Sequence, residues 1–184
     1  MTVTLSNLAA ASGSEIAIPS GHQLQHEGKV VQTVYVRTDV RTTYTANNTG
    51  DGNAITQLRL TIAPKRSDSW IWLRWTVFYE MYHDTVFLVQ ENGALIGYNT
   101  QRGNARWSGI LTPLYDNDYN STPQVSTINW FVRANSTASR YYDLAVRSSQ
   151  GGVFTFALNR TVGSTGTTDY EVGTSFGFAR EISG

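Results

Sequence analysis

The stretch SWIWLRWTVFYE at residues 69–80 constrains the fold more than any other segment of the chain. Its side chains alternate, and a β-strand points successive side chains to opposite faces. One face of such a strand would carry Ile71, Leu73, Trp75, Val77 and Tyr79. The opposite face would carry Trp70, Trp72, Arg74, Thr76 and Phe78. We expect the first face to line a hydrophobic core, whereas the second, with three large rings, needs a cover of its own.

The same period of two continues through most of the chain beyond residue 28. Segments rich in β-branched and aromatic residues predict strands at 29–40, 57–62, 69–80, 85–90, 94–98, 127–133, 141–147, 153–158 and 174–182. Residues 106–111 are a tenth candidate. Turn signals such as Asn92-Gly93 separate these segments, and helical patterning is nearly absent. The sequence therefore predicts an all-β protein, an antiparallel β-sandwich or jelly-roll-like domain.

Residues 1–28 do not share this patterning, since they combine small residues with Pro19 and Gly21. We interpret them as a short extended N-terminal arm or attachment segment. Residues 29–184 then form the sandwich, and a chain of 184 residues suffices for one domain with a sizeable core.

The charge balance argues against several partners. Lys plus Arg and Asp plus Glu number 14 each, which removes the long-range field that would attract nucleic acid or an acidic membrane. No apolar run approaches 18 residues, so we expect no membrane insertion. Cysteine is absent, which excludes disulfides and thiolate sites. Only 15% of residues are charged, so the surface should be neutral and polar, as suits uncharged partners.

Catalytic motifs are absent. His22 and His26 have a metal-binding spacing only if they lie on a helix, and no helix is expected there. The carboxyl groups of Glu80 and Asp84 could in principle act as a glycosidase acid and base, but their position at a loop end is typical of solvated charges. We therefore expect no enzymatic activity and no cofactor.

A partial calcium loop occurs at residues 116–121. Asp116, Asp118 and Asn120 occupy its first, third and fifth positions. Ser121 replaces the required glycine, and Thr127 replaces the bidentate glutamate. The pattern favours an ordinary polar turn, and we expect no bound metal.

The outer row formed by Trp70, Trp72 and Phe78 leaves alternatives open. These rings would present an apolar patch close to the largest that a soluble monomer tolerates. A loop such as residues 99–126 could cover the row, or the row could form a subunit interface, and we rank the two equally. A platform for sugar rings is less favoured, because the row lies in a core-like strand.

Four segments, in this order, resemble a family of phage virion proteins of the tail-fibre type, common in cyanophages and other marine phages. They read IPSGHQLQHEGKVVQTVYVRT, LRLTIAPKRSDSWIWL, ASRYYDLAVRSSQGGVFTFALNR and GTSFGFAREI. The matching positions are Thr61, Pro64, Lys65 and Ser69 in the second segment, and Arg147, Ser148, Gly151 and Gly152 in the third. Trp70 and Trp72 depart from the pattern, in which lysine and an aliphatic residue are usual.

The resemblance implies a structural protein of the virion, made in the host cytoplasm, that serves as a small tail-fibre or fibre-tip subunit for host attachment. Fibres of this type are commonly homotrimers, and a closed assembly would bury the outer row. The arm at 1–28 would then bind other virion proteins. The alternatives are a decoration or adaptor protein of the capsid or tail without receptor binding, and a carbohydrate-active hydrolase or free lectin.

Residues 99–126 are the longest weakly patterned region of the domain, and such loops often contact a partner. Aromatic rings stack on sugars, and amides and carboxylates bind hydroxyl groups. The candidate receptor-facing residues for a host surface glycan are Trp107, Tyr115, Asp116, Asp118, Tyr119 and Asn120. A structural loop packed over the sandwich is the equally ranked alternative.

Overall fold

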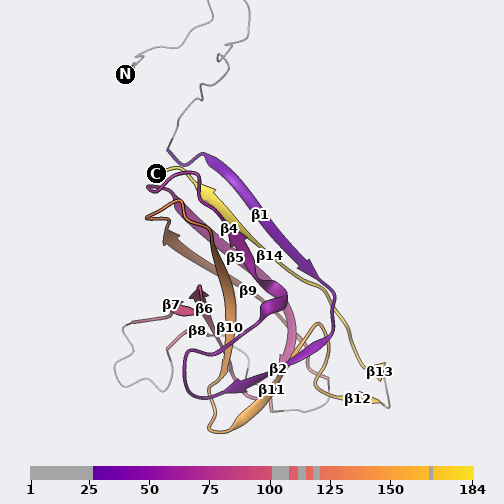
Figure 1. Ribbon diagram of the computed structural model, residues 1–184. Helices are drawn as coiled ribbons and strands as arrows, with labels where there is room; N and C mark the ends of the chain where they lie inside the picture. Colours follow the sequence, from indigo (N-terminus) through magenta and orange to yellow (C-terminus); the bar gives the residue numbers. More distant parts are fainter. Residues whose placement is uncertain (1–26, 101–107, 112–114, 118–120, 166–167) are drawn as a thin grey trace, which may run out of the picture.

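The computed structural model describes residues 27–100, 108–111, 115–117, 121–165 and 168–184 (Figure 1). Trp107, Asp118, Tyr119 and Asn120, together with residues 1–26, lie outside this range. The described chain is almost entirely β-structure, with two antiparallel sheets packed together. The predicted all-β sandwich is therefore confirmed.

The strands follow one another with short connections and a single 3₁₀ turn, η1 (Thr56–Leu58), within the described ranges. Their bounds are β1 (Val30–Thr38), β2 (Thr42–Asn47), β3 (Asn53–Ala54), β4 (Leu60–Ile62), β5 (Trp70–Met81), β6 (Thr85–Glu91), β7 (Ala94–Gly97), β8 (Ile110–Leu111), β9 (Gln124–Arg133), β10 (Arg140–Ser148), β11 (Val153–Leu158), β12 (Ser164–Thr165), β13 (Thr168–Asp169) and β14 (Ser175–Ile182).

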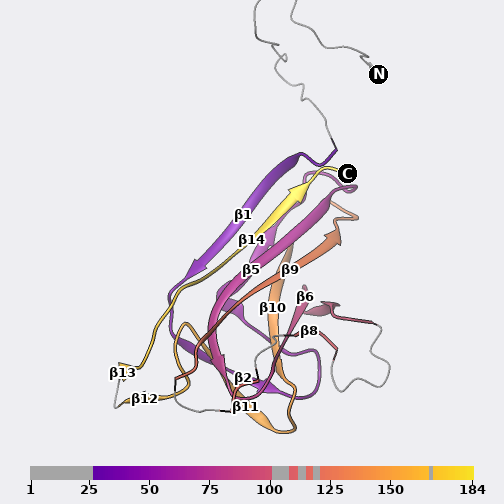
Figure 2. The same ribbon diagram turned by 180° about the vertical axis from the view of Figure 1, so that it is seen from behind.

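The first sheet is built around β5, and Figure 2 shows β1, β14, β5 and β9 running side by side. The first half of β5 pairs with β14, which pairs in turn with β1. The last residues of β5 pair instead with β11, the neighbour of β2. The other edge of β5 pairs with β9 from Trp70 to Tyr79.

The second sheet has β10 and β6 at its centre. The short strands β3 and β4 pair with the free edge of β10, while β7 and β8 pair with the free edge of β6. A separate small ribbon, β12–β13, lies at the end of the molecule away from the start of β1 (Figure 1).

The core lies between the two sheets, and the inner face of β5 occupies its centre. The five inner side chains expected from the alternation, Ile71, Leu73, Trp75, Val77 and Tyr79, are all fully buried. The indole of Trp75 donates a hydrogen bond to the carbonyl oxygen of Leu58 at 2.9 Å, so its polar atom is satisfied. Tyr79 packs edge-on against Phe87 of the second sheet. The first half of the sequence prediction for this strand is confirmed.

Loops of the same chain cover the outer face of the second sheet. Leu88 and Ala145 point away from the core, yet both are fully buried. A Cβ atom at Gly52 or Gly109 would lie 3.0 Å and 3.3 Å from the Leu88 side chain, so both loops pass close to it. The described start of strand β8 follows Gly109 directly, and β8 pairs with β6. This part of the 99–126 loop therefore covers the second sheet and not the outer row of β5.

Several strand boundaries differ from the sequence expectation. The predicted strand at 29–40 ends at Thr38, where the Thr38 hydroxyl accepts a hydrogen bond from the Val40 amide and helps to turn the chain. The threonine-rich β2 was not predicted, because threonine occurs on both of its faces and blurs the alternation. The predicted strand at 57–62 divides into η1 and β4. These differences leave the sandwich unchanged.

A buried carboxylate ties the 63–69 connection to the end of the first sheet. Glu181 of β14 is fully buried and accepts backbone hydrogen bonds from Lys65 at 2.8 Å and Arg66 at 3.0 Å. The side chain of Gln32 donates a further bond at 2.6 Å. Burial alone would raise the pKa of Glu181, but these hydrogen bonds favour the charged form and together lower the pKa below its ordinary value.

We predict that Glu181→Gln lowers the free energy of unfolding at pH 7 by roughly 2 to 4 kcal/mol, because one of the two acceptor oxygens becomes an amide facing N–H donors. A lowered folded-state pKa gives stability above the unfolded pKa of about 4.3 that is lost as pH falls. The gap between wild type and variant should therefore narrow below pH ~4. Urea unfolding at pH 7 and pH 3 measures it, with Asp39→Asn as an exposed control; an unchanged gap contradicts the prediction.

Candidate functional site

The outer face of the first sheet carries several exposed aromatic side chains that no described segment covers. We use "open face" for the residues of β1, β14, β5 and β9 that point away from the second sheet. Strand pairing arranges them in rows across the sheet. One row contains Thr33, Arg180, Trp72 and Phe131, and the next contains Tyr35, Phe178, Arg74 and Asn129.

The open face is rich in exposed aromatic rings. Tyr35 is 82% exposed, Phe131 54%, Phe176 47% and Trp70 38%. Trp72 and Phe178 between them are half-buried. Soluble monomers rarely expose contiguous apolar patches beyond a few hundred Å². This face is therefore a candidate binding surface.

The rings of the open face are held by one another. The Trp72 ring stacks on Phe131 with centroids 5.7 Å apart and planes within 7°, and Phe178 meets it edge-on at 5.2 Å. The guanidinium of Arg133 lies 4.0 Å from the Trp70 ring centroid. These contacts occupy flat ring faces that a stacking sugar would need, so they disfavour the sugar platform.

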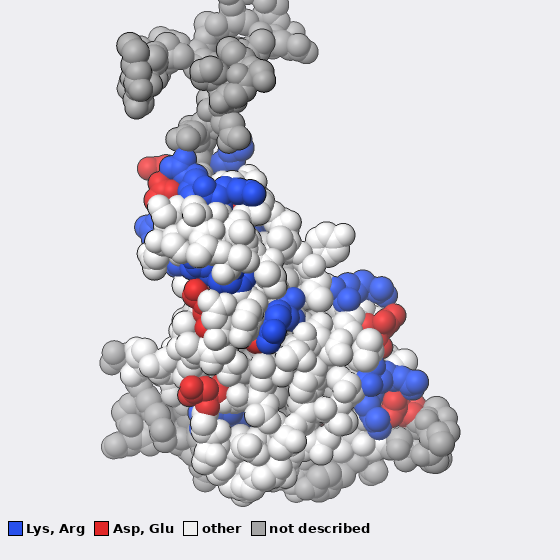
Figure 3. All heavy atoms as spheres, in the orientation of Figure 1, with Lys and Arg blue, Asp and Glu red and all other residues white. Residues whose placement is uncertain are grey.

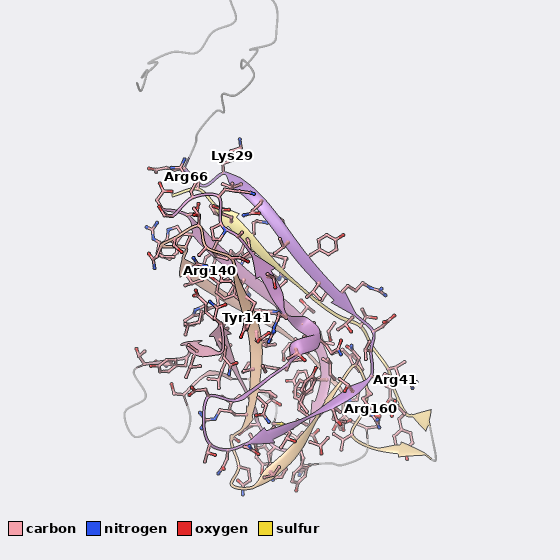
Figure 4. All side chains as sticks on the ribbon, in the orientation of Figure 1. Lys29, Arg41, Arg66, Arg140, Tyr141 and Arg160 are labelled. Carbon is pink, nitrogen blue, oxygen red and sulfur yellow. The ribbon has the colours of Figure 1, made fainter. Side chains whose placement is uncertain are left out.

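The open face is also positively charged. Arg37, Arg74, Arg133 and Arg180 lie on it, and none of the four forms an ion pair with a described carboxylate. The ion pairs of the described chain join other arginines: Arg41 and Arg160 with Asp169, Arg59 with Asp143, Arg66 with Asp68, and Arg140 with Glu91. Arg133 instead donates to the backbone oxygen of Asp68 at 2.8 Å. Figure 4 shows Arg41 and Arg160 near β12–β13, and Arg66 at the opposite end. In the view of Figure 3, acidic and basic groups likewise lie close to one another.

Sequence reasoning missed this charge asymmetry because it used the net charge. The signal was present in the sequence, since Arg74 lies two positions after Trp72 and so shares its face of the strand. Arg180 has the corresponding outward position in the last predicted strand. An arginine at an outward position on each of four neighbouring strands produces a local field that a chain-wide sum conceals.

A shallow apolar hollow of about 330 Å³ lies at one end of the open face, lined by Trp70, Phe131 and Ile182. These residues come from three adjacent strands, with Trp70 paired to Ile182. The hollow is apolar, and Arg133 borders it from its position above Trp70. It can accept an aliphatic or aromatic side chain.

Phe78 points to the same side of the sheet as Trp70 and Trp72, as the alternation predicts, but another segment of the chain packs on it. A Cβ atom at Gly173 would collide with the Phe78 ring, so Gly173 lies directly on it. The Phe78 amide also donates to the Ser175 hydroxyl at 2.9 Å. The segment before β14 thus covers this end of the row. Of the three expected interface residues, Trp70 is exposed, and Trp72 and Phe78 are half-buried.

Of the six candidate receptor-facing residues, the structure describes two, Tyr115 and Asp116. Tyr115 is exposed, and its hydroxyl lies 2.6 Å from Nδ1 of His83. Asp116 is buried and accepts a hydrogen bond of 2.6 Å from the Thr122 hydroxyl. Tyr115 is therefore placed to contact a ligand, whereas Asp116 holds the loop in position.

Glu80 lies beside Asp116 and not beside Asp84. Glu80 is fully buried at the end of β5 and accepts backbone hydrogen bonds from Thr122 at 2.9 Å and Val162 at 2.6 Å. Asp84 instead accepts from the Ser149 hydroxyl. The burial of Glu80 keeps a substrate from its carboxyl group. Within the described ranges, no cluster of three or more histidine and acidic side chains could hold a metal ion.

Comparison with protein-family models and with curated proteins finds no match. Within the described residues, no helix has the length and hydrophobicity needed to cross a membrane.

We predict that the two buried carboxyl groups have opposite pH dependence. Burial raises the pKa of Glu80, and the nearby Asp116 adds to the rise, although the hydrogen bonds from Thr122 and Val162 oppose it. A raised folded-state pKa gives stability that is present at low pH and lost as pH rises through that value. The stability gap between wild type and Glu80→Ala should shrink from pH 5 to pH 8, as measured by urea unfolding. A gap that grows over this range contradicts the assignment.

Proposed function

We propose that this chain is a structural protein of a bacteriophage particle, a small tail-fibre or fibre-tip subunit that assembles as a homotrimer and contacts the host surface. The observation that carries the proposal is the open face, an aromatic surface that one copy leaves exposed. The sequence resemblance to tail-fibre-like virion proteins and the all-β sandwich support it.

Self-association supplies a cover for the open face. Burial of apolar surface drives most protein assembly, and aromatic and arginine side chains are enriched at the centres of interfaces. Trp70, Trp72 and Phe131 are such side chains. Trp72 and Phe131 stack on each other, and Trp70 is held by the Arg133 guanidinium, so all three are positioned before a partner arrives. A preorganised surface of this kind loses little side-chain entropy on binding.

The charge of the open face favours a ring over a two-fold dimer. In a two-fold contact the same patch meets itself, so the unpaired Arg74 and Arg180 of two copies would face each other. Like charges in a desolvated interface are costly. Around a three-fold axis each copy instead presents this face to a different surface of its neighbour.

Two motifs of the resemblance meet in the fold. The amides of Lys65 and Arg66, in the second segment, donate to the carboxylate of Glu181, in the closing strand. The motif positions therefore join distant parts of the sandwich, which supports a common fold among proteins that contain them in this order.

The ends of the domain suit attachment and receptor binding. The chain enters β1 beside the end of β14, where the Gly28 amide bonds to the Ser183 carbonyl. His83 follows the last residues of β5, at the opposite end of the sheet from the Trp70–Ile182 pair, and Tyr115 contacts it. Residues before β1 would bind other virion proteins, and the Tyr115 end would face a host glycan.

We predict that the purified full-length protein is a trimer at micromolar concentration. Light scattering coupled to size-exclusion chromatography measures the mass directly, and a monomer overturns the assembly proposal.

Antibody labelling of intact phage particles locates the chain. Labels on the capsid would overturn the tail-fibre assignment and favour a decoration or adaptor protein.

We predict that Trp72→Ala and Phe131→Thr weaken assembly more than they weaken folding. Both remove rings of the open face, whereas cross-strand contacts of this kind contribute only about 0.2 to 1 kcal/mol each within a sheet. Dilution series by light scattering report the trimer, and urea unfolding reports the domain. Val153→Thr, at an exposed position of β11, is the matched control. If Trp72→Ala unfolds the chain equally at all concentrations, the ring belongs to the monomer alone.

A further inference from the structure

The open face suits an occupant that is both apolar and acidic. It presents exposed rings together with Arg37, Arg74 and Arg180, which form no ion pair with a described carboxylate. The guanidinium of Arg180 lies 4.7 Å from the Phe178 ring centroid and 5.4 Å from the Trp72 ring centroid, at the centre of the aromatic surface. A carboxylate is the acceptor that matches a guanidinium best.

The hollow lies close to the point where the chain enters the sheet. Val30 at the start of β1 pairs with Ile182, and Ile182 pairs with Trp70. Two of these residues line the hollow. Adjacent strands are about 4.8 Å apart, so the hollow begins within roughly 10 Å of the first strand residue.

The segment that precedes β1 contains both a carboxylate and aliphatic side chains. Residues 1–26 lie outside the described range, and they contain no lysine or arginine. Their one acidic residue, Glu15, is followed by Ile16 and Ile18, so that a carboxylate and two aliphatic side chains occur within four positions.

The length of this segment is sufficient for it to reach a second copy. Twenty-six extended residues span up to about 85 Å, whereas a 12-residue strand is about 40 Å long. The segment can therefore cross a whole sheet beyond its own domain.

We infer that the open face of each copy binds residues 1–26 of a neighbouring copy, with Ile16 or Ile18 in the hollow and Glu15 on Arg180. This inference rests on the proposed self-assembly. Exchange around a three-fold axis lets every copy give one segment and receive one, which closes the assembly without placing arginine against arginine. It also gives the arginine-rich face a partner that the described sandwich does not supply.

A charge exchange in the full-length chain tests the inference. Arg180→Glu and Glu15→Arg should each raise the dissociation constant of the trimer at least about tenfold, and the double variant should restore it to within about threefold of wild type. Light scattering over a dilution series measures each constant. Arg41→Glu, which makes the same charge change away from the open face, is the control and should leave the constant unchanged. Glu15→Arg lies outside the sandwich, so it remains informative even if Arg180→Glu destabilises the domain.

A deletion of residues 1–26 provides the second test, since the buried core is formed by residues 46–179. The deleted protein should be monomeric and should bind a fluorescent peptide of residues 1–26, with Arg180→Glu weakening that binding. A deleted protein that remains trimeric overturns the inference and leaves the proposed assembly standing. If the full-length protein is a monomer while the deleted protein binds the peptide, the segment covers the face of its own copy, which also overturns the inference. Arginine-dependent binding of polygalacturonate or oligo-dT, without peptide binding, identifies a polyanion as the occupant and overturns it.

Discussion

The pairing of β5 with three other strands is the interaction on which the rest of the structure depends. β14 and β11 share one edge of β5, and β9 follows the other edge. The inner side chains of β5 fill the core, and its outer side chains form the centre of the open face. Because the side-chain period is two, a one-residue slip against β9 would exchange the two faces. Core stability and the candidate site are therefore fixed by the same register.

Buried polar side chains hold the connections of this cysteine-free chain. Asn159 has a left-handed φ of 57° and donates from its side chain to the carbonyls of Thr38 at 3.0 Å and Val40 at 3.1 Å. The Ser175 hydroxyl donates to the same residue at 2.6 Å. Glu181 and Glu80 hold other loops in the same way, because their carboxylates accept hydrogen bonds from backbone amides. Each anchor joins segments distant in sequence, which is the role that disulfides serve in many small β-domains.

The alternation of side chains along the sequence predicted the features that depend only on neighbouring residues. The alternation at 69–80 identified β5 and its buried face, because strand side chains alternate whatever the tertiary context. The cover of Phe78 could not be predicted in this way, since Gly173 lies 95 positions further along the chain and has no side chain to signal the contact. The proximity of Glu80 to Asp116 was missed for a related reason: strand pairing brings them together, whereas sequence proximity had suggested Asp84. Contacts between distant segments require the topology.

The location of the carboxylates explains how a chain of zero net charge can present a basic surface. Glu80, Asp116, Asp143 and Glu181 are buried and serve as acceptors inside the fold. They count in the net charge of the chain, but they accept hydrogen bonds from backbone amides, hydroxyl groups and Arg59 inside the fold. On the open face Arg37 and Arg133 are exposed, and Arg74 and Arg180 are half-buried. In solvent, screening limits charge interactions to roughly 8 to 10 Å. At that range a ligand responds to the local group of arginines, so the net charge does not argue against an acidic partner at this face.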